Sequence, residues 1–160
     1  MQKTRQIIGY ILFALLLLGI VVGIIILGLL KSCEKEYKVV LKEHGVTKQI
    51  LEFNAYGFAP GESREYDVLL VAKTTGTYKV TLIFEGEVNL FEKYLDVEVE
   101  YNDDIRVNKL SDFLQGEEVQ FMCDISDTAT ITIRYILAID AGNELQGVKS
   151  DFNILFISER

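Results

Sequence analysis

The chain begins with one continuous apolar run. Residues 7–30 contain no charged side chain, and 18 of these 24 residues are Leu, Ile, Val or Phe. As an α-helix the run would be about 36 Å long, which exceeds the ~30 Å hydrocarbon core of a bilayer. A helix that is apolar on every face is typical of a membrane span. We therefore predict a cytoplasmic tail over 1–6, a transmembrane helix over 7–30 and a juxtamembrane linker over 31–36.

After residue 36 the pattern changes to an alternation of apolar and polar positions. In 93–101, for example, Leu95, Val97 and Val99 alternate with acidic residues. A period of two is typical of strands with one buried face. The same pattern marks segments 77–84, 119–125, 128–139 and 151–157, and less regularly 36–42, 48–53 and 64–72. These short strands predict an all-β fold over 37–160, an antiparallel β-sandwich of the jelly-roll or immunoglobulin-like type.

The charge distribution indicates that this domain lies outside the cell. Lys3 and Arg5 give a short basic tail of the kind that stays in the cytoplasm. The chain from Ser32 onward carries 13 of the 16 basic residues and all 24 acidic ones. So acidic a domain is repelled by nucleic acid and by the anionic inner leaflet of a membrane. We expect a single-pass cell-membrane protein with a cytoplasmic N-terminus, an extracytoplasmic C-terminal domain and no nucleic-acid partner.

The end of the apolar run leaves three alternatives for the mature protein. The run is longer than the ~7–15 residues of a secretory signal and no A-x-A pattern follows it, which favours a retained anchor. Cleavage would instead release the domain. Cys33, after Lys31 and Ser32, partly resembles a lipoprotein box, so lipidation at Cys33 is the third alternative. Within the run, Gly19 and Gly23 form a G-x-x-x-G step that would let two transmembrane helices pack closely.

The sequence offers little material for a catalytic site. Its one histidine, His44, precedes a glycine between two predicted strands and is best explained as a turn residue. It contains no metalloprotease, serine-hydrolase or phosphate-binding motif. We therefore expect no enzyme activity, no cofactor and no small-molecule substrate. A hydrolase would need a pocket that gathers two or three of the acidic residues.

Two further groups of residues are open to two explanations each. Asn102, Asp103 and Asp104 crowd oxygen ligands in one loop and form a candidate calcium site, without the spacing of an EF-hand; the alternative is a polar turn. Cys33 and Cys123 could form a disulfide outside the cell. The alternative is that Cys123, at an inward strand position, is a small buried thiol.

The C-terminal stretch 130–156 resembles the end of the domain in the camelysin and TasA-type proteins of Gram-positive bacteria. The matching residues are Ala141, Gly142, Asn143, Gln146, Gly147, Asp151 and Phe152. Upstream, 59–80 is similar to the P-G-D/E step of that family, with matches at Pro60, Gly61, Glu62, Gly76 and Tyr78. The resemblance implies a jelly-roll-like sandwich outside the cell. Members of the family build biofilm matrix fibres, which implies a role in the matrix.

This chain departs from the family in two respects. Family members are longer and are released by signal cleavage, whereas this chain is short and is predicted to keep its anchor. Fibre growth in the family depends on a free N-terminal strand that is given to a neighbour. The equivalent segment here, 36–42, would be tethered close to the membrane, which suits a basal or anchoring subunit.

Edge strands supply the predicted interaction residues, because their unpaired backbone groups can accept a partner's strand. The candidates are Tyr37, Val39 and Leu41 near the anchor, and Phe152, Ile154 and Phe156 at the end of the chain. The alternative is that both strands are paired within the domain. We predict a structural or protein-interaction role at the cell surface, with other surface or matrix proteins as partners. The alternatives are a small binding or sensing module accessory to a membrane complex, and a secreted camelysin-like protein after signal cleavage.

Overall fold

The computed structural model describes residues 37–142, 145 and 148–160. The described strands are β1 (Tyr37–Leu41), β2 (Thr47–Tyr56), β3 (Ser63–Ala72), β4 (Gly76–Gly86), β5 (Leu95–Tyr101), β6 (Asp104–Lys109), β7 (Glu118–Ile125), β8 (Thr128–Leu137) and β9 (Lys149–Glu159). A 3₁₀ turn, η1 (Phe91–Lys93), and one helical turn, α2 (Leu110–Leu114), lie between them. Segments 1–6, 7–30 and 31–36, with Gly19, Gly23 and Cys33, lie outside the described residues. None of the helices described is long and apolar enough to cross a membrane.

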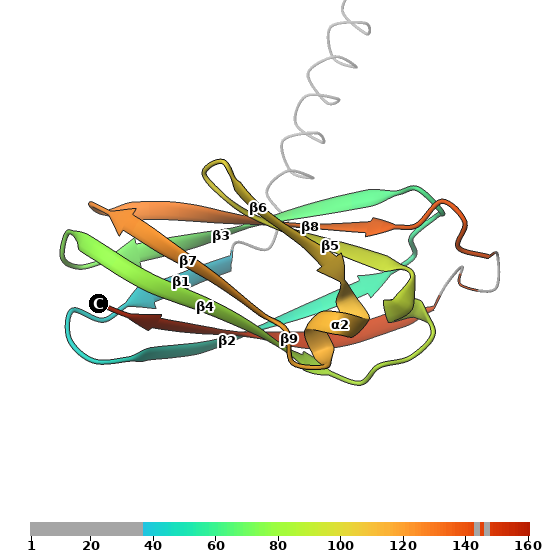
Figure 1. The fold of residues 1–160 in the computed structure, drawn as a ribbon, viewed down its shortest axis with the longest axis horizontal. Helices are drawn as coiled ribbons and strands as arrows, with labels where there is room; N and C mark the ends of the chain where they lie inside the picture. Colours follow the sequence, from blue (N-terminus) through green and yellow to red (C-terminus); the bar gives the residue numbers. More distant parts are fainter. Residues whose placement is uncertain (1–36, 143–144, 146–147) are drawn as a thin grey trace, which may run out of the picture. The chain divides into compact units, whose positions relative to one another are not determined.

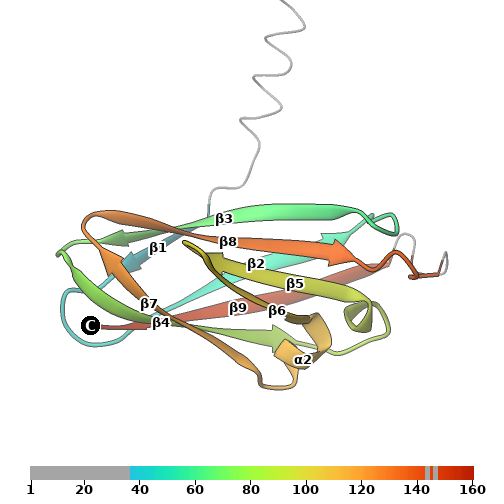
Figure 2. The ribbon, with the colours of Figure 1, turned by 45° about the horizontal axis from the view of Figure 1, so that its top comes forward.

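The strands form two sheets that pack face to face as a β-sandwich (Figure 1). One sheet has the order β1-β3-β8-β5-β6, and the other has the order β2-β9-β4-β7. The predicted all-β sandwich is therefore confirmed, with one correction to its antiparallel character. Strands β1 and β3 run parallel, with Tyr37 beside Val68 and Leu41 beside Ala72. They share a direction because β2, which lies between them in sequence, belongs to the opposite sheet (Figure 2).

The remaining strands pair in a nested order. Strand β5 pairs with β6, β4 with β7, β3 with β8, and β2 with β9, each pair antiparallel. The chain from β2 to β9 is thus one long hairpin whose closed end is the β5–β6 turn. Successive pairs along this hairpin lie alternately in the two sheets, which closes the sandwich around a single core.

The core lies between the sheets and is built from the inward positions of the alternating segments. In β5, Leu95, Val97 and Val99 are buried, while the acidic residues between them are half-exposed. Burying one such aliphatic side chain stabilises the fold by ~1.5–3 kcal/mol. Aromatic rings join the two layers: Phe53 of β2 stacks on Tyr37 of β1, with ring centroids 4.4 Å apart.

Strand β9 lies inside its sheet, which corrects one prediction. It pairs with β2 along one edge and with β4 along the other. The side chains of Phe152, Ile154 and Phe156 are buried in the core. Because both edges of β9 are already paired, these residues offer no edge to a partner strand.

Candidate protein-interaction surface

The sandwich has two sides at which an edge strand of one sheet lies next to an edge strand of the other. Strands β1 and β2 lie together on the first, and β6 and β7 on the second. We call these the β1/β2 side and the β6/β7 side. They differ in how their backbone edges are covered, and this difference defines the candidate surface.

The β1/β2 side is closed by side chains of β2. The amide of Gln49 donates from Nε2 to the carbonyl oxygen of Lys38 at 2.5 Å and accepts at Oε1 from the N–H of Val40 at 3.4 Å. The Thr47 hydroxyl oxygen accepts from the N–H of Lys42 at 2.8 Å. The Gln49 amide therefore pairs with the outer edge of β1 as a short strand would. Covering an edge in this way is a recognised protection against strand addition.

This closure corrects the second interaction prediction. Tyr37, Val39 and Leu41 point into the core and are at most 7% exposed. The hydroxyl of Tyr37 also donates across the two layers to the carbonyl oxygen of Glu52 at 3.4 Å. Strand β1 is an edge strand, as expected, but these three side chains are buried and its outer edge is covered by Gln49 and Thr47.

On the β6/β7 side, strand β6 has polar residues at its inward positions and apolar residues at its outward positions. In β6 the residues paired with the inward positions Val97 and Val99 of β5 are Asn108 and Arg106, which are polar. The apolar residues Ile105 and Val107 face the outside and are 49% and 59% exposed. Inward-pointing charges on an edge strand keep that strand from being packed under the opposite sheet. As a result β6 stands away from β7 and leaves a gap.

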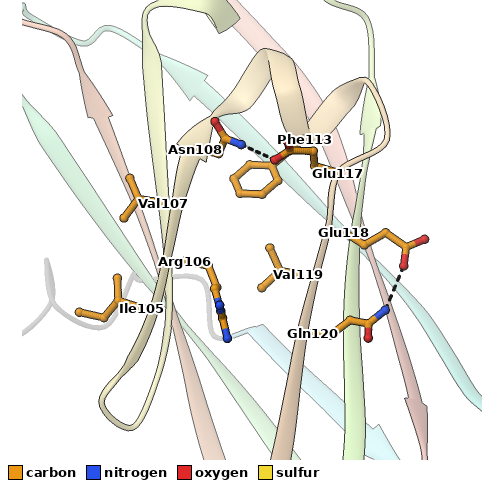
Figure 3. Close-up of a pocket in the computed structure, with 9 residues that line it drawn as sticks. All are labelled: Ile105, Arg106, Val107, Asn108, Phe113, Glu117, Glu118, Val119 and Gln120. Atoms are coloured by element: carbon orange, nitrogen blue, oxygen red, sulfur yellow. Dashed lines mark hydrogen bonds between the residues drawn. The ribbon is translucent and has the colours of Figure 1, made fainter.

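The gap is a groove that runs between β6 and β7. It consists of two hollows of about 500 and 490 Å³ that share Arg106 and Gln120 as lining residues. Figure 3 shows the side chains of Arg106, Phe113 and Val119 in this gap, while Ile105 and Val107 point away from it. We call it the β6/β7 groove, and its lining residues are Tyr101, Asn102, Asp103, Asp104, Ile105, Arg106, Val107, Asn108, Phe113, Glu117, Glu118, Val119, Gln120, Phe121 and Met122.

The groove is acidic at its rim and apolar at its floor. The carboxylates of Asp103, Asp104 and Glu117 lie at its rim against the one cation of Arg106. The side chain of Glu118 points away from the gap, beside Gln120 on the outer face of β7 (Figure 3). Arg106 already pairs with Asp104 at 2.9 Å between Nη2 and Oδ2. The amide of Asn108 donates to Glu117 where the groove meets α2 (Figure 3). Phe113, Val119 and other buried side chains form the floor.

The candidate calcium residues lie at the other end of this groove. Asn102 and Asp103 form the two-residue turn between β5 and β6, with Asn102 at φ +53°. Asparagine tolerates this left-handed conformation better than most residues. Asp104 is engaged by Arg106, and no group of three His, Cys, Asp or Glu side chains in the described ranges is arranged to hold a metal ion. This geometry is that of the polar turn and gives no support to a calcium site.

The outer face of the five-stranded sheet carries an ion-pair network. Arg134 of β8 lies between β3 and β5 and pairs with Glu65 at 2.7 Å and with Glu98. Both carboxylates, that of Glu65 first, raise the pKa of the Arg134 guanidinium. Thr132 donates to Asp67 on the same face at 2.8 Å. These pairs tie three strands together and fill the face with side chains that already have partners.

The remaining candidate chemical groups are buried or lie in turns. Cys123 is a free buried thiol of β7, and burial raises its pKa to about 12. A thiol with so high a pKa is unreactive at neutral pH. Cys33 lies outside the described residues, so the disulfide alternative stays a prediction. His44 is exposed between β1 and β2, as expected of a turn residue.

Comparison with known proteins adds limited information. No protein-family model matches the sequence, and no curated protein matches it. Among solved structures the chain is similar to PliG of Aeromonas hydrophila, a periplasmic inhibitor of g-type lysozyme, with 13% identity over 78% of this chain and 98% of that one and a TM-score of 0.41. It is also similar to the pre-peptidase C-terminal domain of Bacillus anthracis collagenase, with 7% identity over 77% and 95% and a TM-score of 0.38. TM-scores this low carry no inference about function, and the camelysin and TasA-type resemblance stays a prediction.

Proposed function

We propose that this protein is a membrane-anchored, extracytoplasmic β-sandwich that acts at the cell surface by binding other proteins rather than by catalysis. The observation that carries the proposal is that side chains cover the edge strand on one side of the sandwich and leave a groove on the other. Side chains of Gln49 and Thr47 cover the backbone on the β1/β2 side. On the β6/β7 side a hollow groove with an acidic rim lies beside exposed Ile105 and Val107. A surface of this kind suits a protein partner better than a small substrate.

Two further features support a role at the surface or in the matrix. The nested strand pairing supports the jelly-roll alternative over the immunoglobulin-like one. The P-G-E step of the camelysin and TasA-type resemblance forms a tight turn, in which Gly61 has φ +81° and donates to the carbonyl oxygen of Leu137 at 2.8 Å. The carboxylate of Glu62 completes the turn by accepting from the N–H of Ala59 at 2.9 Å. The apolar run 7–30 and the acidic domain support an anchored basal or connecting subunit with its domain outside.

The proposal is tested with the full chain carrying a C-terminal tag in a Gram-positive host. Intact cells are cross-linked with formaldehyde, treated with protease or left untreated. Their membranes are then washed with alkaline carbonate, and the intact mass of the tagged protein is measured by mass spectrometry. We expect the full-length mass in the membrane pellet, loss of the tag when intact cells are treated with protease, and heavier adducts after cross-linking.

Other results contradict parts of the proposal. A mass that begins near residue 33, found in the medium, indicates the secreted alternative. A diacylglyceryl increment on Cys33 indicates a lipoprotein. A tag that is protected in intact cells contradicts the extracytoplasmic placement, and an unchanged mass after cross-linking contradicts the protein-binding role.

A further inference from the structure

We propose that the β6/β7 groove binds an extended, basic segment of a partner protein, which adds as a strand along β6. This inference rests on the proposed function and deepens it, because it names the site and the chemistry of the partner. Three features of the described residues carry it: an uncovered backbone edge, a groove of the right length, and an uncompensated negative charge.

The backbone edge of β6 is the first feature. Alternate residues of an edge strand direct their N–H and C=O groups away from the sheet, where they can pair with an added strand. On β1 those groups are taken by Gln49 and Thr47. On β6 the N–H of Lys109 donates to Oδ1 of Asn108 at 2.9 Å, and the Asn108 amide donates to Glu117, so both contacts lie at the α2 end of the strand. Within the part of the chain that the structure describes, β6 is thus the less covered edge of its sheet.

The length of the groove is the second feature. Strand β6 has six residues, which at ~3.3 Å each give an edge of about 20 Å. The two hollows follow this edge from the turn at Asp103 to α2. A single extended segment of about six to eight residues fills such a length.

The charge of the groove is the third feature and identifies the occupant. Two carboxylates, those of Asp103 and Glu117, remain after Arg106 and Asp104 neutralise each other. Lysine or arginine side chains of a partner would compensate them, and complementary charge also speeds association. The apolar floor at Phe113 and Val119 calls for apolar residues on the other face of the segment. The occupant is therefore a strand in which basic and apolar residues alternate.

A second copy of the chain fits this groove less well. Pairing two β6 strands would bring together two rims that each carry the same excess of carboxylates. Like charges placed opposite each other destabilise strand pairing. The chain as a whole is also acidic, with a formal net charge of −8. A basic partner segment would instead compensate the carboxylates of one rim, so no like charges would lie opposite each other.

The test uses the full-length protein in detergent and a labelled synthetic peptide of about nine residues in which lysine and valine alternate. Binding is measured by fluorescence anisotropy at about 0.1 M salt, where the Debye length is ~10 Å. A peptide with glutamate in place of lysine is the charge control. Two further peptides carry N-methyl groups on all valine or all lysine amides, which removes the N–H donors of one edge at a time. We expect the lysine peptide to bind, the glutamate peptide not to bind, and at least one methylated peptide to bind about tenfold or more weakly.

Matched protein variants show whether the groove is the site. We expect the double variant Asp103→Lys/Glu117→Lys to weaken binding of the lysine peptide about tenfold or more. The control Glu43→Lys/Glu52→Lys makes the same change in net charge on the β1/β2 side, where Glu43 and Glu52 are also exposed. This control should bind the peptide within about twofold of the unmodified protein, because screening confines the effect of a surface charge to ~10 Å at 0.1 M salt.

Several results overturn the inference. Equal weakening by both double variants means attraction by net charge alone. Undiminished binding of both methylated peptides means that no strand is added. Self-cross-linking of a Val107→Cys variant that the peptide does not inhibit means that a second copy occupies the groove. If no peptide binds but intact cells still yield cross-linked adducts, the partner chemistry is wrong and the proposed function stands; if adducts are absent too, both fail.

Discussion

Replacing Gln49 by alanine should loosen the outer edge of β1 without unfolding the domain. The substitution removes two hydrogen bonds, one of 2.5 Å to the carbonyl oxygen of Lys38 and one of 3.4 Å from the N–H of Val40. A hydrogen bond of this kind contributes ~0.5–1.5 kcal/mol, and the second is long, so the expected loss is about 1 kcal/mol in total. Strand β1 keeps its five-residue pairing with β3, so the loss acts mainly on local opening.

Amide hydrogen exchange measures this effect residue by residue. A loss of about 1 kcal/mol in opening free energy makes the Val40 amide exchange roughly fivefold faster. The Lys42 amide, held by Thr47 at 2.8 Å, should change less. The matched control is Gln120→Ala, since Gln120 is an exposed glutamine on the β6/β7 side whose side chain donates to Glu118. Unchanged exchange at Val40, or equal changes with Gln49→Ala and Gln120→Ala, would refute the assignment of Gln49 as the cover of the β1 edge.

Three further substitutions test the core, the buried thiol and a turn. The buried hydroxyl of Tyr135 has no hydrogen-bond partner among the described residues, so Tyr135→Phe should leave the free energy of unfolding unchanged or raise it by up to about 1 kcal/mol; a clear loss in urea unfolding would mean that the hydroxyl is paired. Burial raises the pKa of Cys123 from 9.0 to about 12, so the unfolded chain loses this proton first and stability falls as pH rises above about 9. The free energy of unfolding should therefore fall by about 1 kcal/mol less between pH 8 and 10 in Cys123→Val than in the unmodified protein, and identical pH profiles for the two would contradict this. Gly61 has φ +81° with nothing closer than 3.8 Å to an added Cβ, so Gly61→Ala should cost about 1 kcal/mol through backbone strain alone, and an unchanged unfolding midpoint would contradict that conformation.

Much of the fold could be predicted because burial is periodic in most strands. In β5 the apolar positions recur every second residue and all of them face the core, and in β8 the buried positions are Ile131, Ile133, Tyr135 and Leu137. The parallel pairing of β1 with β3 could not be predicted, because a strand's partner depends on contacts with residues far along the chain, and the pattern of β1 itself is the same in either direction.

The candidate site was harder to predict for two physical reasons. Strand β6 alternates with the reverse phase, with Arg106 and Asn108 inward and Ile105 and Val107 outward. The sequence alone therefore indicated a candidate calcium site or a polar turn at 102–104, and no strand over 104–109. The cover of β1 by Gln49 could not be predicted either, because it consists of hydrogen bonds from a side chain of one sheet to the backbone of a strand in the other sheet. A phase reversal next to a tight turn is the one signal that could have marked the β6/β7 side.

The most direct test of the account places a photo-reactive amino acid at Val107 of β6 or, as the control, at Ile50 of β2, since both are more than half exposed. Intact cells expressing the full chain are irradiated, and the cross-linked peptides are identified by mass spectrometry. The account predicts an adduct at Val107 to an extended basic segment of another surface protein, with little or none at Ile50. Adducts at Ile50 alone, equal adducts at both positions, or none at either would contradict it.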